Sequence, residues 1–379
     1  MEFKYTEAQL LLQKMVREFA EKEVAPIADT LDKEHRFPLE TFRKMAEIGI
    51  TGIGIPVEYG GSGGGDIEKA IIVMEIAKKC AATATVLSVH TSFPQAILKF
   101  GTEAQKRKYL PMMAGGALCG FALTEANAGS DAGSLKTTAV FDEKTGEYVL
   151  NGTKIFITGG ARVDAMVVIA STDPSKGSKG ISAFILEKGT PGFSIGKVED
   201  KMGIHASETV ELVFEDCRIP KENLLGKEGK GFNIALAALD GGRIGIASQA
   251  LGIAEGALEE TIKYMHERTQ FGKPLASFQG LQWYVAEMAT KVEAARWLIF
   301  YAAYLKSTGG NFGKFAAMAK FNASTVAREV TSLAVQIHGG YGYMRDYPVE
   351  RMYRDAKITE IYEGTSEVQK IVISRAILG

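Results

Sequence analysis

The chain has 379 residues, a length typical of two or three domains with a large core. Hydrophobic residues make up 46% of it and charged residues 23%, which is the balance of a globular protein rather than of a disordered chain. The formal net charge of −1 argues against nucleic acid as a partner, because phosphate binding requires a concentrated basic surface.

The cysteines, the histidines and the first residues bear on metals and on the compartment. Cys80, Cys119 and Cys217 lie far apart, and an odd number cannot all pair, which favours a reducing compartment. The five histidines are scattered, so no metal is expected. The sequence begins without a basic or arginine-rich leader, and no apolar run approaches the roughly 18 residues of a membrane helix. We therefore expect a cytoplasmic protein that does not bind a membrane.

Residues 1–118 are predicted to form an N-terminal helical domain. Apolar residues recur at helical spacing from Thr6 to about Leu31, and Thr6 and Gln9 have the spacing of a capping box. Helical patterns then follow in "LETFRKMAEIGI", "DIEKAIIVMEIAKKCAA", "SFPQAILKF" and "EAQKRKYLPMM".

Residues 119–228 are predicted to form a β domain, because the period of the pattern changes. The stretch "KTTAVFDEKTGEYVLNGTKIFITGG" alternates around a turn, and "DAMVVIAST", "GISAFILEKG" and "TVELVFEDCRIP" are short β-rich runs. Strands without helices between them indicate an antiparallel sandwich or barrel.

Residues 229–379 return to the helical period and are predicted to form a C-terminal bundle. Segments such as "FQGLQWYVAEMATKVEAARWLIFYAAYLK" are long and apolar, and bundles of this kind often bury a face in an oligomer. The fold class is therefore α+β, with a helical domain, a β domain and a helical bundle in that order.

Three short stretches each allow two interpretations when taken alone. "FALTEANAGSDAG" (residues 121–133) and "KIFITGG" could bring backbone close to a phosphate or a flat ring, or could be an ordinary polar loop and strand. The paired glycines of "QIHGGYGY" could lie against a cofactor or could simply end a helix.

The stretch "IYEGTSEVQ" places Glu363 just before the last predicted helix. Ser366 and Gln369 have the spacing of a capping box, so the helix is expected to be capped by Ser366. The acid is then either a favourable charge near the positive end of the helix dipole or a base placed for a reaction. The local pattern alone favours the charge.

Taken together, the motifs are more specific. "FALTEANAGSD", "KIFITGG", "RTQFGKP", "QIHGGYGY" and "YPVERMYRDAKITEIYEGTSE", in this order, resemble the acyl-CoA dehydrogenase family, and most closely its short-chain (butyryl-CoA) members. The resemblance covers essentially the whole chain. It implies that a short-chain acyl-CoA is oxidised to the trans-2-enoyl-CoA, and that electrons pass to an electron-transferring flavoprotein.

The resemblance also implies FAD, bound between the β domain and the bundle in a homotetramer whose neighbouring subunit completes the site. The positions that match the family's cofactor contacts are Phe121, Leu123, Thr124, Gly129, Ser130, Phe156, Ile157, Thr158, Arg268, Gln270, Phe271, Gln279, Gln336, Gly339, Gly340, Thr365 and Glu367. The positions that match its acyl-CoA contacts are Ser130, Asp240, Gly242, Arg243, Tyr362 and Gly364.

Glu363 matches the family's catalytic base, which removes the α-proton of the thioester while the β-carbon gives a hydride to the flavin. Isovaleryl- and long-chain-specific relatives carry the base just before the arginine that matches Arg243. This chain has Gly242 there, which cannot act as a base, so the base is expected at Glu363. Ala84 stands where glutaryl-type relatives carry an arginine, which disfavours dicarboxylic substrates.

The residues leave chain length and branching open, although Ser88–Gln95 are expected to form the pocket floor. The alternatives are a short branched-chain dehydrogenase, an acyl-CoA oxidase, and a non-catalytic scaffold of the same fold.

Overall fold

The computed structural model describes residues 4–379 and begins with helices. Thr6 caps the first helix, and the capping box with Gln9 is present as predicted. The helices of this part are α1 (Glu7–Phe19), α2 (Ala25–Glu34), α3 (Leu39–Glu47), α4 (Asp66–Ala77), α5 (Ala81–His90), α6 (Ser92–Phe100) and α7 (Glu103–Ala114), with a π-helical turn at Ala20–Val24 between the first two.

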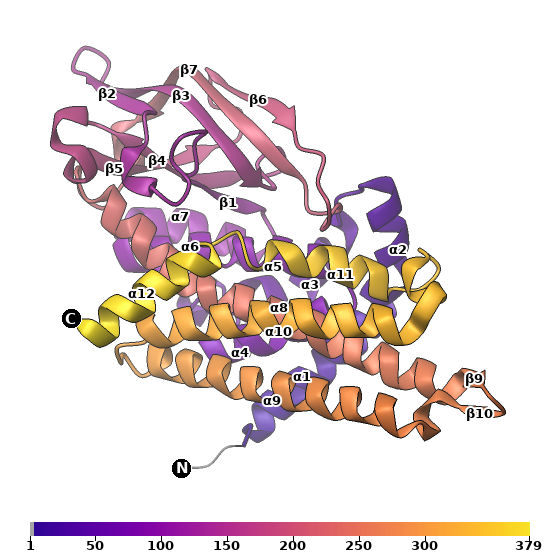
Figure 1. The fold of residues 1–379 in the computed structure, drawn as a ribbon. Helices are drawn as coiled ribbons and strands as arrows, with labels where there is room; N and C mark the ends of the chain where they lie inside the picture. The colour runs from indigo at the N-terminus through magenta and orange to yellow at the C-terminus, as the bar shows by residue number, and fades with distance from the viewer. Residues whose placement is uncertain (1–3) are drawn as a thin grey trace.

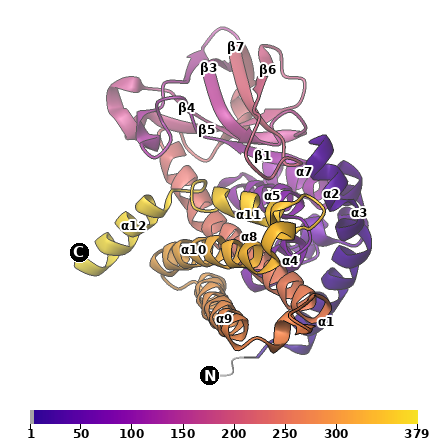
Figure 2. The same ribbon diagram turned by 45° about the vertical axis from the view of Figure 1, so that its right-hand side comes forward.

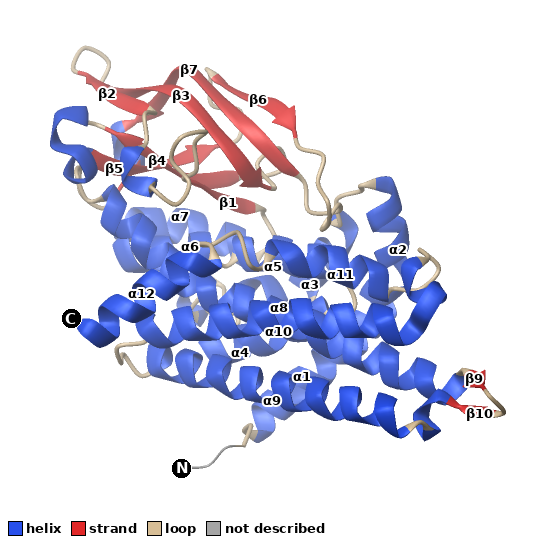
Figure 3. Ribbon diagram, viewed as in Figure 1, coloured by secondary structure: helices blue, strands red, loops and turns tan. Residues whose placement is uncertain are grey.

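The middle of the chain forms one sheet of eight strands that stands on one side of the helices (Figures 1 and 3). Its strands are β1 (Cys119–Ala122), β2 (Thr138–Asp142), β3 (Glu147–Thr158), β4 (Ala165–Ser171), β5 (Ile181–Glu187), β6 (Phe193–Val198), β7 (Thr209–Pro220) and β8 (Leu224–Leu225). The order is β6-β7-β3-β2-β4-β5-β8, and β1 pairs with β4.

Most pairings are antiparallel as predicted, but two are parallel. β1 pairs with β4 over four residues in parallel, and β2 meets β4 in parallel at Thr138 and Ser171. Neither pair is joined by a hairpin, because other segments of the chain separate the partners. Sequential alternation indicates hairpins and carries no signal for such pairs.

Strand β4 links the β domain to the helices because both of its faces are buried. Val167 and Ile169 pack in one apolar cluster with Phe93 and Tyr109 of α6 and α7. Met166 and Val168 point the other way, into a cluster with residues of β3, β5 and β7. The sheet therefore rests firmly on the helices that carry one wall of the site.

The C-terminal part is a bundle built around one long central helix. Its elements are α8 (Gly231–Glu267), the hairpin strands β9 (Thr269–Gln270) and β10 (Lys273–Pro274), α9 (Gln279–Ser307), α10 (Gly313–His338), α11 (Val349–Ile358) and α12 (Ser366–Leu378). In the turned view of Figure 2, α8 runs between α10 and the N-terminal helices.

The two helical regions share one apolar core, in which α4 and α5 pack against α8. Gly252 permits the close contact of α4 and α8, since a Cβ there would lie 2.3 Å from the carbonyl oxygen of Met74. Gly256 makes the same approach to Lys78 one turn later. The first and third parts of the chain therefore form one packed unit beneath the sheet.

Within residues 4–379 no helix is long and apolar enough to span a membrane. The same residues contain no group of three or more histidine, cysteine or acidic side chains placed to hold a metal ion.

Candidate active site

Glu363 lies in the segment between α11 and α12, which passes beneath the β domain (Figures 1 and 2). Its backbone has φ +54° and Gly364 has φ +89°, so two successive residues take left-handed conformations. Such a turn is costly for a residue with a side chain and persists only where surrounding contacts hold it.

Two buried side chains hold this turn through its carbonyl groups. Gln369 donates to the carbonyl oxygens of Glu363 (3.2 Å) and Gly364 (2.8 Å). Lys320 of α10, fully buried, donates to the carbonyl of Gly364 at 2.8 Å. The direction of the Glu363 side chain is thus set by α10 and α12 together.

The cap of α12 differs by one residue from the prediction. Thr365 is the N-cap, and its hydroxyl accepts from the backbone N–H of Val368. Ser366 begins the helix and donates to the carbonyl of Glu360, while Gln369 serves the turn instead of a capping box. The predicted capping box is absent because the Gln369 side chain hydrogen-bonds the carbonyl oxygens of Glu363 and Gly364 instead of the backbone of the N-cap residue.

The carboxyl of Glu363 populates both of its protonation states near neutral pH. Burial raises its pKa to about 7, although Arg243 and Lys320 both act to lower it. A carboxyl with a pKa near neutrality can accept a proton and release it again at physiological pH. Such a perturbed acid beside a cavity is a candidate catalytic group.

Helix α8 brings the predicted acyl-CoA positions Gly242 and Arg243 next to Glu363. A Cβ at Gly242 would lie 2.7 Å from the Glu363 carboxylate, so the absence of a side chain there makes room for this carboxylate. Arg243 is buried and pairs with Asp240, one turn earlier, at 2.5 Å. Burial raises the pKa of Asp240 despite this partner.

Tyr362, the residue before the base, is anchored in the helical core. Its hydroxyl hydrogen-bonds to Gln249 of α8, whose amide donates to Thr85 of α5 at 2.7 Å. Ser130, by contrast, is exposed on the loop after β1. The structure thus places Gly242, Arg243, Tyr362 and Gly364 next to Glu363, Asp240 beside Arg243, and Ser130 on the loop of the β domain.

The cofactor positions of the β domain form one group. Lys154 Nζ donates to the carbonyl of Leu123 at 2.9 Å and to Glu125 at 2.7 Å, and Ile155 N–H donates to the carbonyl of Thr124. These bonds tie the segment of Phe121, Leu123 and Thr124 to the end of β3, which carries Phe156, Ile157 and Thr158. The buried pair of Lys154 and Glu125 was missed in the sequence, where "LTE" and "KIF" gave only separate polar signals.

Phe156 has an unusual conformation at the end of β3. Its φ is +58°, its side chain is 59% exposed, and the register with β7 shifts between Lys154 and Ile157. A bulge with an exposed aromatic ring offers a surface on which a flat ring can lie. Gly129 and Ser130 follow on the exposed loop of the same domain.

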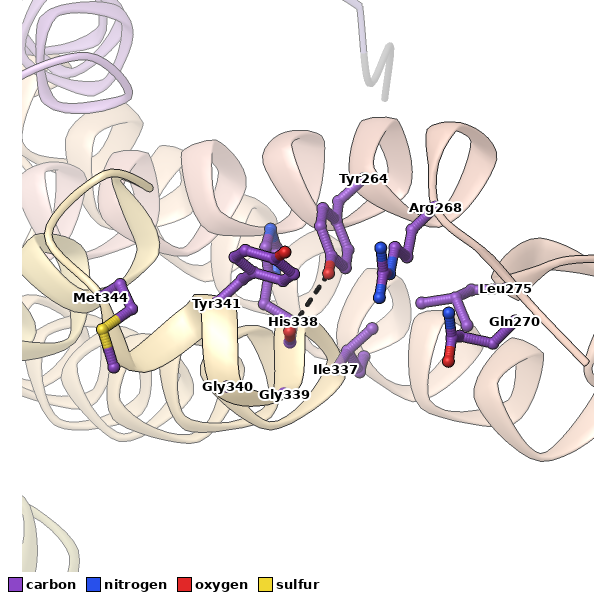
Figure 4. Close-up of a pocket in the computed structure, with 10 residues that line it drawn as sticks. All are labelled: Tyr264, Arg268, Gln270, Leu275, Ile337, His338, Gly339, Gly340, Tyr341 and Met344. Atoms are coloured by element: carbon purple, nitrogen blue, oxygen red, sulfur yellow. Dashed lines mark hydrogen bonds between the residues drawn. The ribbon is translucent and has the colours of Figure 1, made fainter.

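Most of the other predicted cofactor positions lie at the far end of the bundle, near the β9–β10 hairpin (Figure 1). Here a cavity of about 530 Å³ is lined by Tyr264, Arg268, Gln270, Leu275, Ile337, His338, Gly339, Gly340, Tyr341 and Met344 (Figure 4). A Cβ at Gly339 or Gly340 would meet no described atom within 4 Å, so the paired glycines open onto free space.

One chain does not bring the two groups of cofactor positions together. Gln336, Phe271 and Gln279 are exposed near the hairpin, and Phe271 has 93% of its side chain in solvent. Thr365 and Glu367 stay with Glu363 at the start of α12. A cationic Arg268 beside open glycines fits an anionic group, and the exposed Phe156 fits a ring, so the two ends suit different parts of one large cofactor.

A second cavity, about 20 Å³, lies between α4, α5, α6 and α8, and Gly242, which lies against the Glu363 carboxylate, forms part of its wall. It is lined by Asp66, Lys69, Ala70, Val73, Ser88, Thr91, Ser92, Gln95, Gly241, Gly242, Ile244 and Gly245. Four of these come from the segment Ser88–Gln95 that the sequence pointed to. The wall from α4 was missed, because nothing in its helical pattern marks it as part of a site. Ala84 is fully buried in the helical core.

These features define a class of enzyme. Such an enzyme has a carboxyl group whose pKa lies near neutrality beside a small cavity, and it has surfaces that fit a large anionic cofactor with a flat ring. Family models described as the N-terminal, middle and C-terminal domains of acyl-CoA dehydrogenase match residues 6–117, 120–217 and 229–378. The chain belongs to the acyl-CoA dehydrogenase family, and FAD is the cofactor of this family.

Individual relatives are similar over their whole length. An acryloyl-CoA reductase (NADH) of Anaerotignum propionicum is 64% identical, covering 100% of this chain and 96% of the relative. A short-chain specific acyl-CoA dehydrogenase of Clostridium acetobutylicum is 56% identical, covering 100% of both.

Solved structures agree closely with the fold. Butyryl-CoA dehydrogenase from Megasphaera elsdenii is 50% identical with a TM-score of 0.98, and 100% of each chain is covered. A chain in a structure described as the electron transferring flavoprotein of Acidaminococcus fermentans is 54% identical with the same TM-score and the same coverage.

Proposed function

We propose that this protein is a FAD-dependent dehydrogenase that converts a short-chain acyl-CoA, such as butyryl-CoA, to the trans-2-enoyl-CoA. The observation that carries the proposal is the Glu363 carboxyl, with its pKa raised to about 7, lying against Gly242 beside a small cavity. The similar short-chain dehydrogenase and the butyryl-CoA dehydrogenase structure support the substrate class.

The residues of this chain supply the proton chemistry. Glu363 accepts the α-proton, which a thioester does not release unaided, and a positioned base of this kind is worth roughly 10²- to 10⁴-fold. Bound acyl-CoA excludes water from the carboxylate and makes it a stronger base. FAD, when bound, accepts the hydride from the β-carbon.

The strained turn around Glu363 contributes to the same step. Lys320 and Gln369 fix the turn by donating to its carbonyl groups, and neither bond uses the backbone N–H of Glu363. A backbone N–H at Glu363 can then donate to the thioester oxygen and stabilise negative charge as the α-proton leaves.

We further propose that FAD is shared between subunits of a homotetramer. The β-domain positions with Thr365 and Glu367 would come from one chain, and Arg268, Gln270, Phe271, Gln279, Gln336, Gly339 and Gly340 from its neighbour. The separation of these groups within one chain supports this arrangement. So do the exposed apolar residues of the bundle, which include Phe271, Trp283, Tyr301, Tyr304, Ile371 and Ile377.

The electron acceptor is proposed to be an electron-transferring flavoprotein, which the Acidaminococcus fermentans structure supports. The compartment is proposed to be the cytoplasm, and the domain boundaries to fall at residues 118 and 228, from the sequence patterns.

A second candidate is the reverse reaction, reduction of a short enoyl-CoA. The acryloyl-CoA reductase, at 64% identity, favours it. The same residues serve both directions, since a carboxyl that accepts the α-proton in oxidation donates it in reduction. A pKa near 7 leaves both forms of Glu363 populated at neutral pH.

A spectroscopic experiment tests the proposal and separates the two directions. The FAD-loaded protein should bleach under anaerobic conditions on addition of butyryl-CoA, and the chemically reduced protein should regain its colour with crotonyl-CoA or acryloyl-CoA. Rates for the two half-reactions show which direction is faster. Failure of every acyl-CoA and enoyl-CoA to change the flavin spectrum would refute both functions.

A further inference from the structure

One wall of the cavity beside Glu363 carries a charged network. Lys306, near the end of α9, donates to Asp66 at 2.8 Å and to Gln95 at 2.9 Å. Lys69 pairs with the same Asp66 at 3.6 Å. The carboxylate of Asp66 therefore pairs with two ammonium groups, in a place where the other lining residues are uncharged.

The network borders the space that an acyl chain would enter. Asp66, Lys69 and Gln95 line the cavity together with Gly242, against which the Glu363 carboxylate lies. Gly241 of α8 faces the same network, since a Cβ there would lie 2.8 Å from Gln95 Oε1 and 3.0 Å from Lys306 Nζ.

Removing more water from the ammonium of Lys69 would cost free energy, because the group is already largely desolvated. Its side chain is 14% exposed, and burial lowers its pKa to about 8 even though Asp66 acts to raise it. Methylene groups pressed against it would remove the remaining hydration without offering a partner, and a buried charge without new partners is costly. A terminal methyl that stops short of Lys69 avoids this cost.

We propose that Lys69, backed by Asp66 and Lys306, limits the substrate to acyl groups of three or four carbons. This inference rests on the proposed function and names its substrate class. The cavity of about 20 Å³ holds roughly one water-sized group, so a longer acyl chain would have to press against the charged side chains of its wall. Lys69 acts here as a specificity residue that excludes longer chains.

The main test compares the acyl-length profile of wild type and Lys69→Met, both loaded with FAD. Methionine keeps the length of the side chain and removes the charge, while Lys306 remains on Asp66. For wild type, kcat/KM should fall at least tenfold from the four-carbon to the six-carbon acyl-CoA. In Lys69→Met the ratio of six-carbon to four-carbon activity should rise at least tenfold.

A matched control and an opposite variant sharpen the test. Lys79→Met removes a lysine that follows the same helix and pairs with Glu259 at 4.0 Å, so the profile should not change. Gly245→Ala narrows the cavity, because its Cβ would meet Ser88 Oγ at 2.5 Å, and should favour three carbons over four. The Glu363→Gln background prevents turnover, so dissociation constants of the acyl-CoAs can be measured in it. They should show the same preference for acyl length as kcat/KM.

The outcomes separate the inference from the proposed function. An unchanged length profile and unchanged dissociation constants in Lys69→Met would overturn the role of Lys69 and leave the dehydrogenase intact. Turnover of glutaryl-CoA by wild type would also overturn it, because the ammonium would then recognise a terminal carboxylate. No turnover of any acyl-CoA by wild type would refute the function and the inference together.

Discussion

At the scale of single residues, Glu363 and Lys320 form a functional pair although 43 positions separate them in the chain. Glu363 takes a left-handed backbone conformation, and Lys320 holds the following carbonyl at 2.8 Å. Burial lowers the pKa of Lys320 to about 8, while Glu363 acts to raise it. A buried lysine that bonds a strained turn beside a base is costly to keep, which is a physical reason to assign it a role in the site.

Replacing Glu363 by glutamine should abolish turnover while leaving binding intact. Glutamine preserves the shape of the side chain but cannot accept the α-proton, so kcat with butyryl-CoA should fall by roughly 10²- to 10⁴-fold or more. FAD content and the dissociation constant for butyryl-CoA should stay near wild type. Glu360→Gln, in the same segment, is the control and should remain active; substantial turnover by Glu363→Gln would move the base elsewhere.

Lys320→Met should shift the pH profile upward. The active form of Glu363 is the carboxylate, so kcat/KM should rise with pH through a midpoint near 7 in wild type. Loss of the Lys320 charge leaves only Arg243 to lower the pKa of Glu363, so the midpoint should move to higher pH, with a loss of roughly tenfold at pH 7.

Two further variants show whether the charge of Lys320 is responsible. Lys320→Arg retains the charge and should restore part of the original midpoint. Lys314→Met, at the half-buried start of α10, should leave it unchanged. A loss of activity in Lys320→Met without any movement of the midpoint would reduce Lys320 to a purely structural residue.

At the scale of elements, α8 does more than fill the core. It packs on α4 through glycines, carries Arg243, and lines the small cavity with Gly241, Gly242 and Gly245. Small residues along this helix let two neighbours approach it: α4 on one side and the turn of Glu363 on another. The low side-chain bulk of α8 thus creates both the packing and the space for chemistry.

Gly242→Ala should inactivate the protein without unfolding it. The new Cβ would lie 2.7 Å from Glu363 Oε2 and must displace the carboxylate, while alanine favours the helix by about 0.5–1 kcal/mol. The melting temperature should therefore hold while kcat falls by roughly 10²-fold, the effect expected of a misplaced catalytic group. Gly280→Ala in α9, where a Cβ meets no described atom, is the control; full activity of Gly242→Ala would show that the carboxylate does not need this space.

At the scale of the whole molecule, the cofactor positions divide into two groups at opposite parts of one chain. The β domain and the Glu363 segment hold one group, and the cavity at the β9–β10 hairpin holds the other. A second copy of the chain is the simplest source of the missing half.

Mixing two inactive variants should restore activity if the site is shared. Arg268→Glu removes a cation from the hairpin cavity and should weaken FAD binding in the neighbour's site, while Glu363→Gln removes the base of its own site. Mixed tetramers then contain some sites with a native Glu363 and a native neighbouring Arg268, and these should turn over butyryl-CoA. A double variant mixed with either single variant is the control and should stay inactive. Absence of recovery despite proven subunit exchange would place the whole FAD site within one chain.

Much of the fold was predictable because local periodicity reports local structure. The changes of period near residues 118 and 228 led to the correct order of helical, β and helical parts, and the capping box at Thr6 is present. The family motifs were short and continuous, so the position of Glu363 before α12 could also be placed from the sequence.

What the sequence by itself determined was the type of each element and the family motifs, because both depend on neighbouring residues. Only the tertiary structure revealed that α4 supplies Asp66 and Lys69 to the small cavity at Gly242, that Lys320 supports the turn at Gly364, and that Thr365 rather than Ser366 caps the last helix. The first two features arise from contacts between segments far apart in the chain, which helix packing sets. The cap is local, but it depends on the turn of Glu363 and Gly364, whose carbonyl groups bind Gln369. The near-neutral pKa of Glu363 also depends on the tertiary structure, because it is produced by burial and not by neighbouring residues in the sequence.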